Sequence, residues 1–165
     1  MTKQSAVALF LASALLLAGC GHRGNGPRVL ASGAAGAESW QLVLSHDQLG
    51  LCIEVRNSAE PDQTAGYCNP DPEQIGSLSD VVVGWNHSTC PCFRIAEVNK
   101  GVTLLHAHFT NGETLTFQPI DGGPDSPINF VVVPLAGSVE HADLDVWTIE
   151  WEDRGPEMIR VSPTP

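Results

Sequence analysis

The stretch Leu104-Leu105-His106-Ala107-His108-Phe109-Thr110-Asn111-Gly112-Glu113-Thr114-Leu115-Thr116-Phe117-Gln118-Pro119-Ile120 predicts a β-hairpin. Asn111-Gly112 is a strong turn signal, because both residues tolerate the positive φ of hairpin turns. A two-residue loop would mix polar and apolar side chains on both faces. A three-residue loop, Thr110-Asn111-Gly112, with Gly112 in the left-handed conformation of a β-bulge, places the polar and the apolar side chains on opposite faces. The two registers differ by one residue, and such a shift moves every side chain to the other face. The second register is predicted, with Leu105, Ala107, Phe109, Leu115 and Phe117 buried and His106, His108, Thr114 and Thr116 towards solvent.

Segments rich in strand-forming residues lie on both sides of this hairpin, separated by turns with Gly, Pro or Asn. They are 29–33, 40–44, 51–55, 67–68, 80–86, 93–98, 130–133, 144–151 and 158–161. After residue 20 there is no helical periodicity of useful length. Many short strands with turns between them favour an all-β fold, and we expect residues 31–162 to form a single immunoglobulin-like β-sandwich with Greek-key connections.

The amino-terminal segment has the layout of an export signal. Lys3 precedes an apolar run over 6–17, which is too short to span a bilayer, and the run ends in Leu17-Ala18-Gly19-Cys20. This tetrapeptide resembles the lipobox of bacterial lipoproteins. The resemblance implies that residues 1–19 are a lipoprotein signal peptide, that Cys20 carries a diacylglyceryl thioether, and that the new amino terminus is acylated.

The lipobox resemblance also implies a location. We expect residues 20–30 to be a lipidated flexible tether, because Gly, Asn, Pro and Arg fill 21–28 without periodicity. The lipid on Cys20 would hold the protein in a membrane of the cell envelope. That membrane is the outer membrane in a diderm and the outer face of the cell membrane in a monoderm.

A second resemblance covers most of the remaining chain. Its motifs, in order, are Gly33, Gly36, Trp40-x-Leu42, Gly50-Leu51-Cys52, Cys68, Val83-Gly84, Asn111-Gly112 and Phe130-Val131-Val132-Val133-Pro134-Leu135. This order is similar to that of small secreted or lipid-anchored bacterial β-sandwich proteins. The resemblance implies the fold and brings no activity with it.

The charge balance restricts the class of partner. The chain has 165 residues, with 19 acidic against 8 basic side chains and a net charge of -11. Nucleic acids and anionic lipid surfaces are bound by clustered Lys and Arg, so neither is expected as a partner of the folded part. The residues beyond Cys20 are enough for one domain with its own core.

Four cysteines remain once Cys20 is committed to lipid, and an exported chain favours disulfides between them. Cys52 and Cys68 lie on neighbouring predicted strands, and we expect them to be paired. Cys90 and Cys92 would lie about 6.5 Å apart in an extended strand. A disulfide needs Cβ atoms about 3.8 Å apart, so Pro91 must bend the chain if these two are joined. Crossed pairings such as Cys52 with Cys90 stay open.

The same segment allows a metal-binding alternative. His87-x-x-Cys90-x-Cys92, with His106 and His108 nearby if the strands pack suitably, offers the thiolate and imidazole ligands that zinc and copper prefer. The spacing is not that of a known zinc module. A second disulfide with solvated histidines is therefore favoured, and no metal site is assigned.

No catalytic residues are predicted. Ser138, His141 and Asp143 lie too close in one loop for triad geometry, and no nucleophile elbow is present. Carboxylates in 121–125 and at Glu140, Asp143 and Asp145 lack the spacing of an EF-hand calcium loop. Trp40, Trp85, Trp147 and Trp151 are of the kind that fills cores and sheet edges, although Trp147 and Trp151 share a face that could be partly exposed.

The sequence therefore predicts a lipid-anchored protein of the cell envelope that is a non-enzymatic binding or structural module without a cofactor. An exposed patch around Trp147 and Trp151 would favour an envelope protein or a glycan as the partner. The alternative is a copper- or zinc-binding lipoprotein that uses His87, Cys90 and Cys92.

Overall fold

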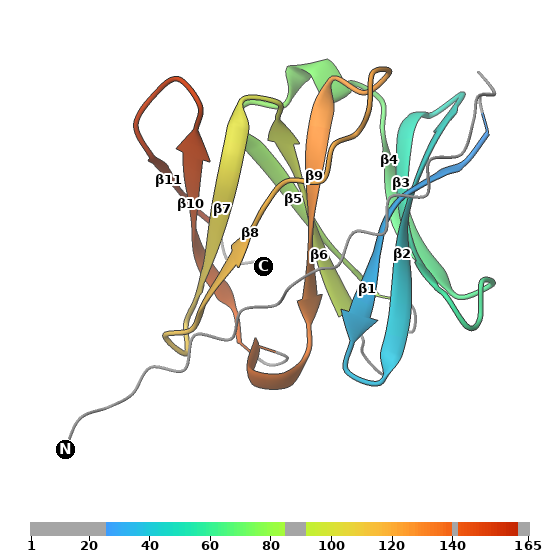
Figure 1. Cartoon of the computed structure of the whole chain (residues 1–165), viewed down its shortest axis with the longest axis horizontal. Coiled ribbons are helices and arrows are strands. Elements are labelled where there is room, and N and C mark those ends of the chain that lie inside the picture. Colours follow the sequence, from blue (N-terminus) through green and yellow to red (C-terminus); the bar gives the residue numbers. More distant parts are fainter. Residues whose placement is uncertain (1–25, 85–91, 140–141, 162–165) are drawn as a thin grey trace.

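The fold consists of three antiparallel sheets (Figure 1). The computed structural model describes residues 26–84, 92–139 and 142–161. The N-terminal sheet has the order β1 (Arg28–Ala35), β2 (Glu38–Asp47), β3 (Gly50–Asn57) and β4 (Thr64–Asn69). The middle sheet has the order β5 (Leu78–Gly84), β6 (Cys92–Asn99) and β9 (Ile128–Leu135). The C-terminal sheet has the order β11 (Glu157–Arg160), β10 (Leu144–Trp151), β7 (Val102–Phe109) and β8 (Thr114–Phe117).

The helical segments that the structure describes are two short 3-10 turns, η1 (Pro72–Gln74) and η2 (Gly137–Val139). Among the described residues, no helix has the length and apolar character needed to cross a membrane. The all-β class predicted from the sequence is confirmed.

The middle sheet lies between the other two and contributes to a core on each of its faces (Figure 1). Phe93, Ile95, Phe130 and Val132 pack against the N-terminal sheet. Alternate residues of the same strands pack against the C-terminal sheet: Ala96, Val98, Val131 and Val133. Because both faces are covered, β9 carries the apolar run 130–133 without alternation, and β6 is mostly apolar on both faces.

The finer expectation, an immunoglobulin-like sandwich with Greek-key connections, is not confirmed. A sandwich of that kind has two sheets, whereas the described strands form three. The sequence carries the reason, since 130–133 is apolar on both faces of a strand and therefore needs a layer on each side. Periodicity shows that a strand is buried, but it does not show how many sheets bury it.

The predicted hairpin register is confirmed. Leu105 pairs with Phe117, His106 with Thr116, Ala107 with Leu115 and His108 with Thr114. Gly112 has a φ of 84°, and its amide donates to the Phe109 carbonyl at 2.9 Å. The apolar face packs into the core between the middle and C-terminal sheets, so His106 and His108 lie on the outer face.

Strand β10 departs from strict alternation. Alternation would place Leu144 on the same face as Val146, yet Leu144, Trp147 and Ile149 are all buried in one core. A register shift between Leu144 and Val146 on β10, opposite β7, produces this change. A β-bulge inserts one extra residue and so moves the preceding side chain to the other face.

Candidate functional site

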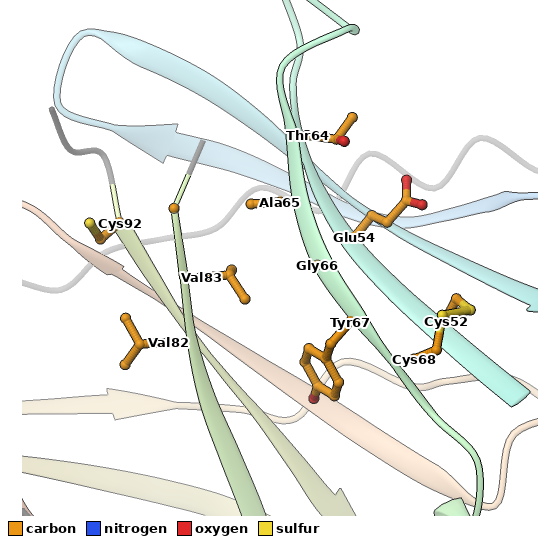
Figure 2. A pocket seen from close by; sticks show the side chains of 11 residues that line it. Cys52, Glu54, Thr64, Ala65, Gly66, Tyr67, Cys68, Val82, Val83 and Cys92 are labelled. Carbon is orange, nitrogen blue, oxygen red and sulfur yellow. A yellow bond between two sulfur atoms is a disulfide. The ribbon is translucent and has the colours of Figure 1, made fainter. Parts of the chain in front are cut away.

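A groove of about 770 Å³ runs between β4 and β5 (Figure 2). Strand β4 contributes Ala65, Gly66 and Tyr67 to its lining, and β5 contributes Val82 and Val83. β4 is the edge strand of the N-terminal sheet and β5 is the edge strand of the middle sheet. The groove therefore lies where two stacked sheets both present an edge.

Each of these edge strands is paired on one side among the described residues. β4 hydrogen-bonds to β3, and β5 hydrogen-bonds to β6. Unpaired edges present rows of backbone N–H and C=O groups that can accept a further strand. Val81 and Val82 of β5 are 36% and 48% exposed, so apolar side chains accompany the open edge.

A buried polar cluster lies beside this groove, at the interface between β6 and β4. Glu97 of β6 is 1% exposed, and its Oε2 accepts a hydrogen bond of 2.6 Å from Asn69 Nδ2. Glu97 Oε1 and the Tyr67 hydroxyl have no partner at full hydrogen-bond geometry within the described part of the chain, although the Tyr67 hydroxyl and the Glu97 carboxyl interact with each other. The cluster thus joins the two sheets through the Asn69–Glu97 hydrogen bond, with the Tyr67 hydroxyl beside the same carboxyl.

Burial controls the titration of this cluster. Loss of solvation raises the pKa of Glu97, and the interactions of its carboxyl with Asn69 and with the Tyr67 hydroxyl oppose the rise in part. Burial also raises the pKa of Tyr67, and the neighbouring Glu97 carboxylate raises it further. Both changes favour the neutral form of each side chain.

A disulfide joins Cys52 and Cys68, the pairing that the sequence predicts. The two residues are direct register partners on β3 and β4, so the bond ties the edge strand to its neighbour. Both cysteines line the groove. Asp47 lies within 4.8 Å of the two sulfur atoms, but sulfurs joined in a disulfide are not the thiolates that bind metals.

Cys92, the first residue of β6, also lines the groove and is also disulfide-bonded. Its partner lies outside the described residues, as do His87 and Cys90. The pairing of Cys90 with Cys92 and the metal-binding alternative therefore stay predictions. In its disulfide form Cys92 does not offer the thiolate that zinc or copper requires.

His106 and His108 form a hydrogen-bonded ladder on the outer face of the C-terminal sheet. His106 contacts Thr116 Oγ1 at 2.9 Å through Nδ1 and Glu150 Oε1 at 3.0 Å through Nε2. His108 contacts Thr114 Oγ1 at 3.0 Å and Thr148 Oγ1 at 2.9 Å. This face points away from the middle sheet, so the structure does not bring the two histidines to Cys92.

Trp147 and Trp151 do not form an exposed aromatic patch. Trp147 is fully buried, and its Nε1 donates to Asp80 Oδ2 at 3.3 Å. Trp151 is half-buried beneath the guanidinium of Arg154, which lies 3.5 Å from its ring centroid. Trp40 is 7% exposed in the other core, as expected of a core residue, and Trp85 lies outside the described residues.

Among the loop carboxylates, Asp121 is held by its own surroundings. Asp121 accepts from the Gly123 amide at 2.9 Å and lies 3.5 Å from Lys100 Nζ. The amide hydrogen bond, with a smaller contribution from Lys100, lowers the pKa of this exposed carboxyl. Glu140 and His141, on which the carboxylate and triad patterns at 138–145 depend, lie outside the described residues.

Sequence reasoning missed the groove and the cluster beside it. A signal was present at Glu97, which is a lone acidic residue at an inward position of the apolar strand Cys92–Asn99. A second signal was Val81-Val82-Val83, an apolar run that lies on β5, an edge strand of the middle sheet. Neither signal locates the groove, because which strands lie at edges depends on the pairing of the whole chain.

Comparisons of this chain with protein-family models, with curated proteins and with solved structures found no match. Residues 1–25, which contain the lipobox and Cys20, lie outside the described part of the chain.

Proposed function

We propose that this protein is a lipid-anchored, non-enzymatic binding module of the bacterial cell envelope, and that the groove between β4 and β5 is its binding surface. The lipobox Leu17-Ala18-Gly19-Cys20 supports the anchor. More than one acyl chain on Cys20 would make attachment stable, because a single chain binds membranes only marginally.

One observation carries the assignment of the binding surface. Two sheets leave their edge strands on the two sides of the same groove, and the exposed valines of β5 lie at this edge. Binding surfaces typically combine apolar contact area with a few polar groups that fix orientation. The backbone edges supply the polar groups here, and the valines supply the apolar area.

The chemistry of the lining supports binding in preference to catalysis. Cys52, Cys68 and Cys92 are held in disulfides and are not nucleophiles in that state. Glu54 is ion-paired with Arg56 at 2.7 Å. Glu97 lies behind the groove, where it is buried and hydrogen-bonded to Asn69.

The anchor is tested by labelling cells with an alkyne analogue of palmitate and separating membrane from soluble protein. We expect the wild-type chain to be labelled and to sediment with membranes. Cys20→Ser should lose the label, whereas Gly21→Ser, the neighbouring control, should keep it. Label that persists in Cys20→Ser would show that the lipid is not on this cysteine.

The groove is tested by placing a photoreactive amino acid at Val82 of the full chain and irradiating intact cells. The matched control is Val29 of β1, which is 54% exposed against 48% for Val82 and also lies on an edge strand. A discrete adduct at position 82 and none at position 29 is expected. Equal adducts at both positions, or none at 82, would contradict a binding role for the groove.

A further inference from the structure

We propose, on the basis of the binding role above, that the ligand of this groove is an extended polypeptide strand of basic character. The strand would hydrogen-bond to the outer edge of β5 and become the fourth strand of the middle sheet. The proposal rests on the pairing of the three sheets, the side chains of β5 and the charge of the protein.

The middle sheet has fewer strands than the layers on either side of it. Its three strands lie between two sheets of four strands each (Figure 1). On the β9 side one end of the edge is covered, since the amides and carbonyls of Ile120 and Phe130 bond reciprocally at 2.6 and 2.9 Å. On the β5 side no bridge of this kind is present among the described residues, and this edge borders the groove beside β4. Within the described part of the chain, the position for an added strand is therefore next to β5.

Strand β5 lacks the usual protection of an exposed edge. Natural edges carry Lys or Pro, or are bent by bulges, which prevents pairing with another chain. β5 contains no Lys or Pro, and its pairing with β6 is continuous from Leu78 to Gly84. Its one charged residue, Asp80, is turned to Arg94 and Trp147 and does not guard the edge.

The side chains of β5 indicate which residues the added strand would carry. Val83 packs against the core shared with the N-terminal sheet, and Val82, its neighbour, faces the opposite side of the middle sheet. Cross-strand pairs of β-branched residues are favourable. Valine, isoleucine or threonine on the added strand, opposite Val82 and Val83, would therefore continue the apolar surface on both faces of the middle sheet. The row of backbone groups matches a polypeptide, whereas a glycan would be expected to stack on exposed aromatic rings.

The charge of the protein selects between polypeptide partners. The net charge of the chain is -11, and no Lys or Arg lines the groove, where the one acidic side chain, Glu54, is already ion-paired with Arg56. A second copy of this chain would bring the same negative charge, which opposes association. A basic strand is attracted, since complementary charge steers the encounter and favours one partner over others.

The probe is a capped fluorescent peptide of about seven residues, the usual length of a strand, in which a central run of valine and threonine is flanked by lysines. Binding to the full chain in mild detergent is followed by fluorescence anisotropy. Two further peptides carry N-methyl groups on alternate amides, one on each edge of the strand. Strand addition requires that one of these two binds and the other does not, since only one edge of the peptide faces β5.

Two variants of the protein locate the site. Val82→Lys should weaken binding roughly tenfold or more, because it places a charge on the edge and repels a basic peptide. Val29→Lys adds the same charge at a matched exposed edge position and should leave binding unchanged. Amides of Leu78–Gly84 should exchange more slowly in the complex, and thermal melting shows that both variants are folded.

The outcomes separate this inference from the proposed function. If both N-methylated peptides bind equally, or if exchanging lysine for glutamate in the probe leaves binding intact, a basic added strand is ruled out. A wild-type dimer in sedimentation that Val82→Lys dissociates would make a second copy the occupant and overturn the proposal. An adduct at position 82 without peptide binding overturns this inference alone, whereas no adduct and no binding overturns both.

Discussion

The two interfaces of the middle sheet bury carboxylates in different ways. Towards the C-terminal sheet, Asp80 accepts hydrogen bonds from the Arg94 guanidinium and from Trp147 Nε1. Towards the N-terminal sheet, Glu97 has the neutral amide of Asn69 and no cationic partner within the described residues. A buried charge is stable only when it is paired, so the first interface holds an ion pair and the second favours a protonated acid. The interface with the carboxyl that lacks a cationic partner is the one that lies beside the groove proposed as the binding surface, and functional sites often depart from optimal packing.

The largest effect of a single substitution on stability is expected from breaking the Asp80–Arg94 ion pair. Asp80→Ala leaves Arg94 without its carboxylate in a site where the Arg94 side chain is 13% exposed. Removing one partner of a fully buried pair costs about 3–5 kcal/mol, and for this part-buried pair we expect a loss of about 2–3 kcal/mol, which should appear as a lower midpoint in urea denaturation.

The matched control is the double variant Asp80→Ala with Arg94→Met. Replacing a buried pair by apolar side chains is often nearly neutral, so the double variant should recover most of the lost stability. A single variant that loses less than about 1 kcal/mol would show that the pair is solvated and unimportant.

The next effect tests how β4 is held on the groove side. β4 pairs with β3 alone among the described strands, and the Cys52–Cys68 disulfide closes a sequence separation of 16 residues. Replacing both cysteines by alanine should cost about 3 kcal/mol through the greater freedom of the unfolded chain. Amide exchange in Thr64–Asn69 should accelerate, while exchange in Leu144–Trp151 of the other interface changes only with global stability. Equal acceleration in both strands beyond the change in global stability would contradict a local role for the bond.

The sequence predicts the elements of this fold better than their arrangement. Asn111-Gly112 and the two faces of the hairpin determine a local register, and the structure has that register. Cys52 and Cys68 were found because they lie on strands that follow one another. The three layers, the covered edge of β9 and the open edge of β5 were not found, because each depends on contacts between segments far apart in the chain. The burial of Leu144 in the same core as Trp147 depends on pairing in the same way, since the bulge after Leu144 is set by β7.

The smallest expected effect is a pH-dependent change in stability at Glu97, the carboxyl that has no cationic partner within the described residues. Burial raises the pKa of Glu97 above its ordinary value of 4.5, so the folded state binds this proton more tightly than the unfolded chain does. The stabilising contribution is therefore complete below about pH 4.5 and is lost as the pH rises through the raised pKa. Glu97→Gln keeps a neutral side chain at every pH and should be more stable than the wild type at neutral pH, by an amount on the order of 1 kcal/mol.

Glu54→Gln provides the control for this change on the outer face of the N-terminal sheet. Glu54 forms a partly exposed ion pair with Arg56, and such pairs contribute about 0–1 kcal/mol. Chemical denaturation from acid to neutral pH should show the difference between Glu97→Gln and the wild type growing with pH, with no such growth for Glu54→Gln. A difference that shrinks with pH would mean that Glu97 is stabilised as a carboxylate, so that a cation reaches it in solution. The contrast between the two interfaces would then disappear, since both would hold a paired charge.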